Sequence, residues 1–426
     1  MRPHSRRRVL QLGAAAGTFA LAGCLEGNRS ARAPAQRRIE HATQPPDGTW
    51  PSAGYDARNT RTNPSASPPR SDPAAVWSAP LSGVVSALVV GPEYVYASTD
   101  AETVALARDG DEGWRVGVGG DALAYHAGRV YVSGDTLRAL DATSGAERWR
   151  SFTGDASPGA VYETSGTVYV TGRTHVYGVH PDSGARRWDI ETARYPSIVA
   201  DDARVGVLTS DRIQFVAPGE TVDGLLRDPG PRTSESVRLG WSPEVYSGVL
   251  TDDALFVPQY GDRLADTNAT VRRYDLPLED DRWMTPYTWA GIGTIAVDED
   301  RVYASPYRAT TDPPDGSLVA LDRRRGTERW RYDGSMLGPP AVGGDTVVAG
   351  GADPGSPSVC VSTANTTPDC PPAEGPAETG VLHGFDAATG EQLWTIRPGA
   401  SYGGYPVALV GDRVYYGDGE GVHVLE

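Results

Sequence analysis

Residues 139–149 read Ala-Leu-Asp-Ala-Thr-Ser-Gly-Ala-Glu-Arg-Trp, which predicts a strand end, a tight turn and the start of a second strand. Asp141 suits the opening of the turn, and Gly145 suits a backbone position with positive φ. Trp149 then falls on the second strand, where its large ring can pack between neighbouring sheets. Close variants of this stretch recur at residues 178–188, 320–330 and 384–394. The chain is therefore expected to be built from repeats.

A short apolar strand recurs eight times along the chain. Its copies are Val95-Tyr96, Val130-Tyr131, Val168-Tyr169, Val205-Gly206, Leu255-Phe256, Val302-Tyr303, Val347-Val348 and Val414-Tyr415. Alternating hydrophobicity and a high content of β-branched and aromatic residues predict strands rather than helices. From Ala74 to Glu426 each unit would hold about 44 residues, a length that suits a four-stranded propeller blade.

A tryptophan closes each unit and is expected to dock one blade on the next. Seven follow their strands in order: Trp114, Trp149, Trp188, Trp241, Trp283, Trp330 and Trp394. The eighth unit ends at Glu426 without one, whereas Trp77 lies on an isolated strand, residues 75–81, before the first unit. Pairing that strand with the last unit would cover two exposed edges. The sequence predicts an all-β, eight-bladed propeller of four-stranded antiparallel blades, the last closed by an N-terminal strand.

The pattern of Asp, Gly and Trp closely resembles the quinoprotein, or PQQ-like, propeller repeat, and the resemblance covers the chain from Trp50 onward. Residues 50–60, which begin Trp-Pro, resemble a lead-in segment that often precedes such propellers, and we expect them to pack against the body. Propellers of this type occur in pyrroloquinoline-quinone dehydrogenases and in non-enzymatic exported lipoproteins such as BamB. The fold alone does not choose between these functions.

The N-terminus resembles an export signal. Ser5-Arg6-Arg7-Arg8 is similar to a twin-arginine motif, and the apolar stretch after it is too short to span a bilayer. Leu21-Ala22-Gly23-Cys24 resembles the lipobox of secreted lipoproteins. We therefore predict a signal peptide over residues 1–23, lipidation of Cys24, a Pro-rich tether over residues 24–73 and the propeller over residues 74–426. This layout implies attachment to the outer face of the cell membrane.

The chain contains no lysine, so its 39 basic residues are all arginine, against 55 Asp and Glu for a net charge of −16. This composition excludes sites that need a lysine amine, including the P-loop phosphate site and the pyridoxal Schiff base. The negative charge also argues against nucleic-acid binding. Abundant acid without lysine resembles proteins of halophilic archaea, in which concentrated salt screens the repulsion. A GC-rich genome is the alternative explanation.

The sequence offers no catalytic or metal-binding motif. The dehydrogenases of the resembling family hold Ca²⁺ with Glu, Asn and Asp and often carry adjacent cysteines, whereas no two cysteines are adjacent in this chain. We expect Cys360 and Cys370 to close a Pro-rich loop as a disulfide worth roughly 2–3 kcal/mol. A redox pair is the alternative. His175 and His180 are separated by five residues and would point to opposite faces of a strand. No metal or cofactor is therefore predicted.

Aromatic and Arg residues cluster in the loops expected at the channel rim. They are Arg194, Tyr195, Tyr287, Trp289, Tyr402 and Tyr405. Such side chains serve as interface anchors, but they would equally suit filling the channel. The hypothesis is a non-catalytic, lipid-anchored scaffold whose partner is another extracytoplasmic or membrane protein. The alternatives are a PQQ- and Ca²⁺-dependent dehydrogenase and a cell-surface glycan-binding module.

Overall fold

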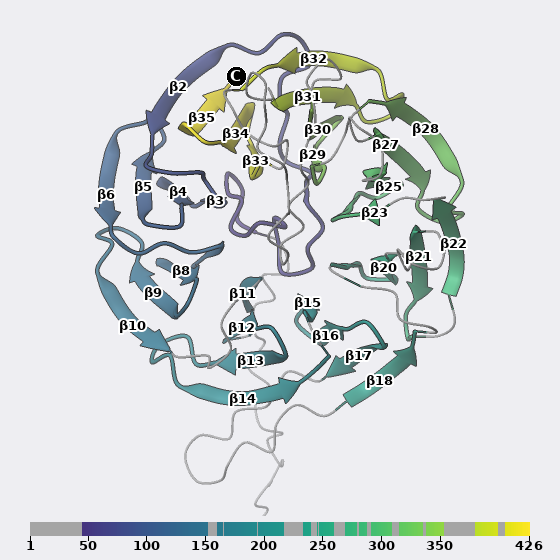
Figure 1. Cartoon of the computed structure of the whole chain (residues 1–426), viewed down its shortest axis with the longest axis horizontal. Coiled ribbons are helices and arrows are strands. Elements are labelled where there is room, and N and C mark those ends of the chain that lie inside the picture. The colour runs from purple at the N-terminus through teal and green to yellow at the C-terminus, as the bar shows by residue number, and fades with distance from the viewer. Residues whose placement is uncertain are drawn as a thin grey trace, which may run out of the picture. The chain divides into compact units, whose positions relative to one another are not determined.

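Eight sheets surround a central axis and form a β-propeller, six of them four-stranded, one five-stranded and one six-stranded (Figure 1). This computed structural model describes residues 45–151, 160–164, 166–193, 195–216, 233–239, 245, 247–259, 269–278, 281–287, 291–308, 315–334, 338–352, 380–398 and 405–426. Within these ranges the regular secondary structure is entirely β. The predicted fold class and blade number are confirmed.

Blades 1 to 4 follow one another along the chain, each from its inner to its outer strand. Blade 1 is β3 (Ala87–Val90), β4 (Tyr94–Ser98), β5 (Thr103–Ala107) and β6 (Glu112–Val116). Blade 2 is β7 (Ala122–His126), β8 (Arg129–Ser133), β9 (Leu137–Asp141) and β10 (Glu147–Ser151). Blade 3 is β11 (Val161–Thr164), β12 (Thr167–Thr171), β13 (His175–Val179) and β14 (Arg186–Glu191). Blade 4 is β15 (Ser197–Ala200), β16 (Val205–Leu208), β17 (Arg212–Val216) and β18 (Thr233–Arg238).

Blades 5 to 8 continue the ring, with interruptions in blade 6 and additions from the N-terminal region in blades 7 and 8. Blade 5 is β19 (Val249–Leu250), β20 (Ala254–Gln259), β21 (Ala269–Asp275) and β22 (Asp281–Tyr287). Blade 6 is β23 (Gly291–Ile292), β24 (Ala296–Val297), β25 (Arg301–Ala304), β26 (Pro306–Arg308), β27 (Asp315–Asp322) and β28 (Glu328–Asp333). Blade 7 is β29 (Ala341–Gly343), β30 (Thr346–Ala352), β31 (Gly380–Asp386) and β32 (Gln392–Ile396), joined by β1 (Thr62–Asn63). Blade 8 is β33 (Val407–Val410), β34 (Arg413–Gly417), β35 (Gly421–Leu425) and β2 (Ala75–Pro80).

The N-terminal strand β2 closes the ring as predicted. It pairs antiparallel with β35, with Trp77 opposite Val424 and Ser78 opposite His423. The amides of Ala74 and Glu426 extend the pairing by bonding to each other's carbonyl oxygens at 2.8 and 3.0 Å. Because β2 and β35 come from opposite ends of the chain, blade 8 forms only when both ends are in place.

The closing tryptophans lie on outer strands and reach across to the next blade. The indole N–H groups of Trp114, Trp149, Trp283, Trp330 and Trp77 donate to the carbonyl oxygens of Ala142, Pro181, Arg323, Ala387 and Arg108. The turn glycine of the next blade makes room for the ring. Gly390, for example, has φ +75°, and a Cβ there would lie 2.6 Å from the indole of Trp330. Glycine is thus required at this turn both for its conformation and for its lack of a side chain.

Blade 4 departs from the predicted pattern. Its outer strand β18 ends at Arg238, and Glu235 pairs with Phe215 at the register position that tryptophan occupies in the other blades. The expected docking residue Trp241 lies outside the described residues. The docking role of Trp241 therefore stays a prediction, and Glu235 holds this register position in the described part of blade 4.

Residues 49–67, here called the channel segment, wind around the inside of the ring (Figure 1). Their backbone bonds in chain order to the innermost strands, beginning with the Trp50–Val90 bridge and continuing with Tyr125, Ala200, Leu250, Val297 and Val342. The side chain of Asn63 and the amide of Ser67 then bond to the carbonyl oxygens of Leu409 and Gly411 in blade 8. These contacts attach the channel segment to the propeller, in agreement with the expected packing of residues 50–60 against the body.

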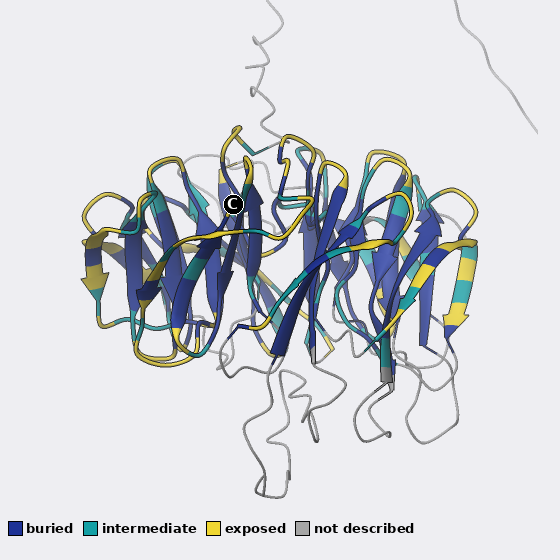
Figure 2. Cartoon of the chain, turned by 90° about the horizontal axis from the view of Figure 1, so that it is seen from above, coloured by how far each residue is buried: buried dark blue, intermediate teal, exposed yellow. Residues whose placement is uncertain are grey.

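The core lies between the blades, and the exposed residues lie on outer strands and turns (Figure 2). The inner and second strands are almost wholly buried, whereas outer strands such as β6 and β10 bury mainly their tryptophan. Several channel-segment contacts fall on the last residues of inner strands, for example Val90 and Ala200. The segment therefore crosses the channel at the end where first strands turn into second strands. We call this side, which also carries the turns at residues 142–146 and 322–327, the turn face.

Candidate functional site

Asn59 and Asn63 of the channel segment are buried at the turn-face end of the channel, and their side chains are bonded to the protein. The amide group of Asn59 donates to the Gly248 carbonyl at 2.8 Å, and that of Asn63 donates to Leu409 at 2.9 Å. Asn63 Oδ1 accepts from the Tyr55 hydroxyl and the Ser65 amide. Among the described residues no group of three His, Cys, Asp or Glu is placed to hold a metal ion. The residues present there do not fit the Ca²⁺ ligand set expected of a quinone dehydrogenase.

Asp56 and Arg61 are ionisable groups buried within the channel segment. Asp56 Oδ1 accepts the Thr60 amide at 2.9 Å, so this carboxylate shapes the turn of the segment. Arg61 donates to the carbonyl oxygens of Pro340 at 2.8 Å and Ala53 at 2.9 Å and ties the segment to blade 7. Burial raises the pKa of Asp56 to about 6 and lowers the pKa of Arg61 to about 10. Both residues therefore have structural roles that burial makes costly when they are charged.

Replacing Asp56 with asparagine is expected to stabilise the protein at neutral pH. Below the unfolded pKa near 3.8, the Asp56 carboxyl is protonated in both the folded and the unfolded protein and costs no stability. The protein loses stability as pH rises through the folded pKa of about 6, because the buried carboxyl then becomes charged. Asp56→Asn keeps a carbonyl oxygen for Thr60 and removes the buried charge, so the gain above that pKa is up to about 3 kcal/mol. Denaturant unfolding at acidic and neutral pH measures it. Asp412→Asn, at an exposed side chain, is the control, and equal pH profiles for Asp56→Asn and wild type would contradict the expectation.

The predicted rim residues do not form an exposed binding site in the described structure. Tyr287 ends the outer strand β22 and is 7% exposed, and Tyr405 is 3% exposed and packs edge-on against Tyr416. Tyr195 is half-buried at φ +55°. The other three candidates, Arg194, Trp289 and Tyr402, lie outside the described residues. Tyr287 and Tyr405 are thus corrected from partner anchors to packing residues, because their rings are covered by neighbouring strands.

Ser78, His423 and Asp418 form a hydrogen-bonded line on blade 8. The Ser78 hydroxyl lies 2.9 Å from His423 Nδ1, and His423 Nε2 lies 2.9 Å from Asp418 Oδ1. That oxygen also accepts the amides of Glu420 and Gly421. Burial alone would raise the pKa of Asp418, but His423 and the two amides more than offset it and hold the pKa below its usual value. These hydrogen bonds compensate for the burial of Asp418 Oδ1 beside the pairing of β2 with β35.

Asp418→Asn is expected to reduce stability by about 1–3 kcal/mol at neutral pH, since a neutral amide accepts these hydrogen bonds more weakly. Because the folded pKa is depressed, the contribution of Asp418 is present above its unfolded pKa and is lost as pH falls through the folded pKa. The difference between variant and wild type should therefore shrink at low pH. Thermal unfolding across a pH series checks this, with the exposed Asp412→Asn as control. A pH-independent difference would contradict the account.

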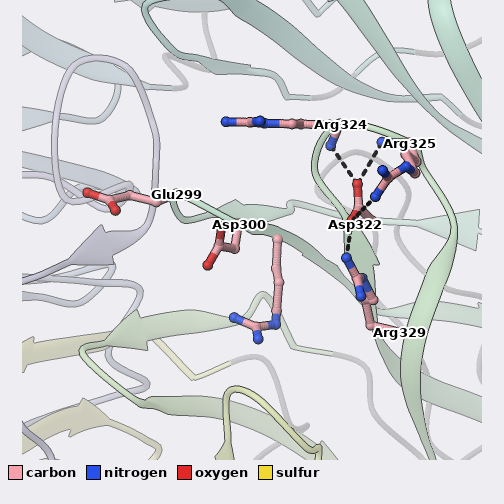
Figure 3. Close-up of a pocket in the computed structure, with 7 residues that line it drawn as sticks. Glu299, Asp300, Asp322, Arg324, Arg325 and Arg329 are labelled. Carbon is pink, nitrogen blue, oxygen red and sulfur yellow. Dashed lines mark hydrogen bonds and ion pairs between the residues drawn. The ribbon is translucent and has the colours of Figure 1, made fainter.

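A pocket of about 300 Å³ opens on the turn face of blade 6 (Figure 3). One wall is the hairpin between β24 and β25, with Glu299, Asp300 and Arg301, and the other is the turn between β27 and β28, with Asp322, Arg324, Arg325 and Arg329. It thus gathers four arginines and three carboxylates from two short turns. Among the described parts of the chain it is a concave site of concentrated charge, and its arginines can bind anions.

Asp322 organises the second wall of the pocket. Its Oδ1 accepts the amides of Arg324 and Arg325 at 3.0 and 2.8 Å, and its Oδ2 pairs with Arg329. Burial acts to raise the pKa of Asp322, but Arg329 and the two amides more than offset it, and the pKa lies below its usual value. Asp322 is therefore an ionised structural carboxylate. The sequence identified this turn as a copy of the repeat but did not predict the pocket. The run Arg323-Arg324-Arg325, which the other turns lack, is the signal that could have indicated it.

Sequence comparison identifies part of the repeat. Residues 69–217 match the family described as outer membrane protein assembly factor BamB. The matched region covers about a third of the chain, from before β2 through β17. No curated protein sequence matches the chain.

Solved structures show the same architecture at low identity. Quinohemoprotein alcohol dehydrogenase from Comamonas testosteroni superimposes with a TM-score of 0.63 at 15% identity, covering 90% of this chain and 81% of its own. BamB from Moraxella catarrhalis gives 0.56 at 17% identity, covering 83% and 97%. The computationally designed protein Ika8 gives 0.61 at 11% identity, covering 82% and 98%. The family match over residues 69–217 and these structures support a PQQ-like type of repeat. At such identities the solved structures establish the fold and leave function open.

Several expectations fall outside the structure. Cys24, Cys360 and Cys370 are not among the described residues, so lipidation and the disulfide stay predictions. Across the described ranges, no helical segment has the length and apolarity of a membrane span.

Proposed function

We propose that this PQQ-like propeller is a non-catalytic, extracytoplasmic lipoprotein that binds another protein and serves as a scaffold at the cell surface. In this proposal residues 1–23 direct export, Cys24 carries the lipid, and the partner is an extracytoplasmic or membrane protein. Acidic surface charge would keep the propeller soluble in concentrated salt.

The filled channel is the observation that carries this proposal. The channel segment bonds to inner strands around the ring, and its Asn59 and Asn63 side chains are committed to those bonds. A buried, hydrogen-bonded segment cannot yield its position to a ligand without breaking these contacts. The turns and outer strands are the exposed parts of the described propeller (Figure 2). Binding is therefore expected on the outer surface of the ring.

Two further findings favour a protein partner over the dehydrogenase alternative. The sequence match is to an outer membrane protein assembly factor, a description that concerns assembly of proteins. The described residues of the channel do not supply a Ca²⁺ ligand set, because their oxygens and amides bond to the backbone. The third candidate, a glycan-binding module, needs exposed aromatic side chains, and none of the described Phe, Tyr or Trp residues is exposed.

The test is native mass spectrometry with ultraviolet-visible spectroscopy on the full chain, gently extracted from its own membranes in high salt and cross-linked in parallel. A colourless propeller that carries a polypeptide, cross-linked to turn-face or outer-strand residues, is the expected result. The chain mass also reports whether cleavage before Cys24 and lipidation have occurred.

Each other outcome overturns the proposal in a specific way. A retained quinone mass with Ca²⁺, together with dye reduction on adding alcohols or sugars, would establish the dehydrogenase. A bound glycan without polypeptide would establish the glycan-binding module. A propeller with no partner in membranes under any extraction condition would also contradict the scaffold.

A further inference from the structure

The turn of blade 6 carries arginines that the fold itself does not need. In blade 2 the equivalent turn has Thr143 and Ser144, whose amides bond to Asp141 Oδ1 at 3.1 and 2.9 Å. In blade 7 it has Ala388 and Thr389, whose amides bond to Asp386 Oδ1 in the same way. Arg324 and Arg325 hold these two positions in blade 6 and make the same amide bonds. Because only the backbone amides of Arg324 and Arg325 hold the turn together, the turn does not require their guanidinium groups.

The neighbouring arginines have structural partners. Arg323 pairs with Asp253 and donates to Thr251 in blade 5, and its guanidinium lies 5.8 Å from the ring centroid of Phe256. Arg329 pairs with Asp322, as Arg148 pairs with Asp141 in blade 2. Arg323 thus stabilises the interface with blade 5, and Arg329 stabilises the turn.

Arg324 and Arg325 are left facing solvent. Arg325 is 74% exposed and lies 3.7 Å from Asp322, a carboxylate already bonded to Arg329 and two amides. Among the described residues, Arg324 has no carboxylate within ion-pair distance. Arg301 adds a further cation on the opposite wall of the pocket. The lining carries four arginines against three carboxylates, so the pocket is about one charge positive in a chain of net charge −16.

The chemistry of this wall selects carboxylates. A guanidinium group binds a carboxylate through two parallel N–H···O bonds, and several such groups in a concave site favour neighbouring acidic side chains. A cavity of about 300 Å³ has room for side chains of a peptide but not for a folded surface. Glu299 and Asp300 on the other wall repel negative groups, so an acidic side chain can bind only where it contacts the arginines directly.

We propose that the blade 6 pocket docks an acidic segment of the protein partner, with Arg324 and Arg325 pairing with its Asp or Glu side chains. This inference rests on the proposed binding function and adds the partner's chemistry to it. The propeller then holds its partner at the turn face, beside the end of the channel that the channel segment closes.

The test compares the full chain with Arg324→Thr/Arg325→Ser, a variant that copies the turn of blade 2 and so keeps every backbone bond of blade 6. Fluorescence anisotropy measures binding of a labelled oligoglutamate peptide and of its oligoglutamine counterpart. The control is Arg150→Ser/Arg186→Thr, which removes the same charge at exposed positions in blades 2 and 3.

Wild type is expected to bind oligoglutamate and not oligoglutamine, and the pocket variant to lose about tenfold or more in affinity. The control should change by less than about twofold at an ionic strength that screens distant charges. Unchanged thermal unfolding shows that the pocket variant is folded, and Arg324→Thr alone replaces it should the double variant unfold.

Equal losses in the pocket variant and the control would overturn the inference and reduce the effect to net charge. Binding of inorganic phosphate without binding of oligoglutamate would also overturn it, since the pocket would then be a small-anion site. If the variant cross-links its cellular partner as well as wild type does, the pocket assignment fails while the scaffold function stands. If wild type has no partner, the scaffold function fails.

Discussion

Trp330→Ala is expected to lower the free energy of unfolding by about 3–5 kcal/mol. Trp330 is 8% exposed, packs against Tyr303 at 6.0 Å between ring centroids and donates its indole N–H to Ala387 in the next blade at 2.9 Å. The substitution leaves a cavity between blades 6 and 7 and removes the donor to a buried carbonyl group. Chemical denaturation in high salt measures the loss.

Two variants set the scale for Trp330. Met284→Ala truncates a side chain that is 45% exposed on β22 and should cost less than about 0.5 kcal/mol. Trp330→Phe keeps most of the ring volume and loses the hydrogen bond, so it should fall between the two. If Trp330→Ala costs no more than Met284→Ala, the closing tryptophans do not hold neighbouring blades together.

A chain that begins at residue 68 is expected to lose much of its stability compared with a chain that begins at residue 45. The shorter chain lacks the channel segment, whose backbone makes two hydrogen bonds to Val90 and one each to Tyr125, Ala200, Leu250, Val297 and Val342. With about 1 kcal/mol for each such bond, the loss is on the order of 7 kcal/mol. Unpaired edges of the inner strands would also expose apolar surface. Denaturation midpoints and dye binding to apolar surface measure both effects.

The two truncations are matched because both remove the N-terminal 44 residues and both retain β2, the strand that closes blade 8. They also retain Pro69, whose carbonyl accepts the indole N–H of Trp394 at 2.8 Å. Arg61→Ala in the longer chain should reproduce part of the loss, because it removes bonds to Pro340 and Ala53. Equal stability of the two chains would show that the channel segment does not stabilise the propeller.

Ring closure shows where sequence reasoning was sufficient. Trp77 stood apart from its repeats, and the last unit lacked a tryptophan, so both anomalies pointed to one pairing, which β2 and β35 make. The turn at residues 139–149 was also predicted correctly: Asp141 bonds to amides two and three residues ahead, and Gly145 has φ +71°. Interactions between residues so close in sequence depend on residue type and spacing alone.

The rim residues show where such reasoning failed. Tyr287 and Tyr405 lie in loops by sequence and were expected near the channel mouth, yet each ring is covered by strands from elsewhere in the chain. The hydrogen-bonded line of Ser78, His423 and Asp418 could not be predicted from the sequence either, since Ser78 lies more than 300 residues before the other two. Burial of an aromatic residue depends on what packs over it, and spacing along the chain does not report that.

By itself the sequence determined the number of blades, the PQQ-like type of the repeat and the strand that closes the ring. These follow from a pattern of short-range turns and strands that recurs along the chain. Only the tertiary structure decided that the channel segment fills the channel and that two turns of blade 6 gather arginines into a pocket. The channel segment lies outside the repeat and meets partners far away in sequence, so no local pattern encodes its position. The pocket requires two separate turns of blade 6 to face each other, and residue spacing alone does not report that.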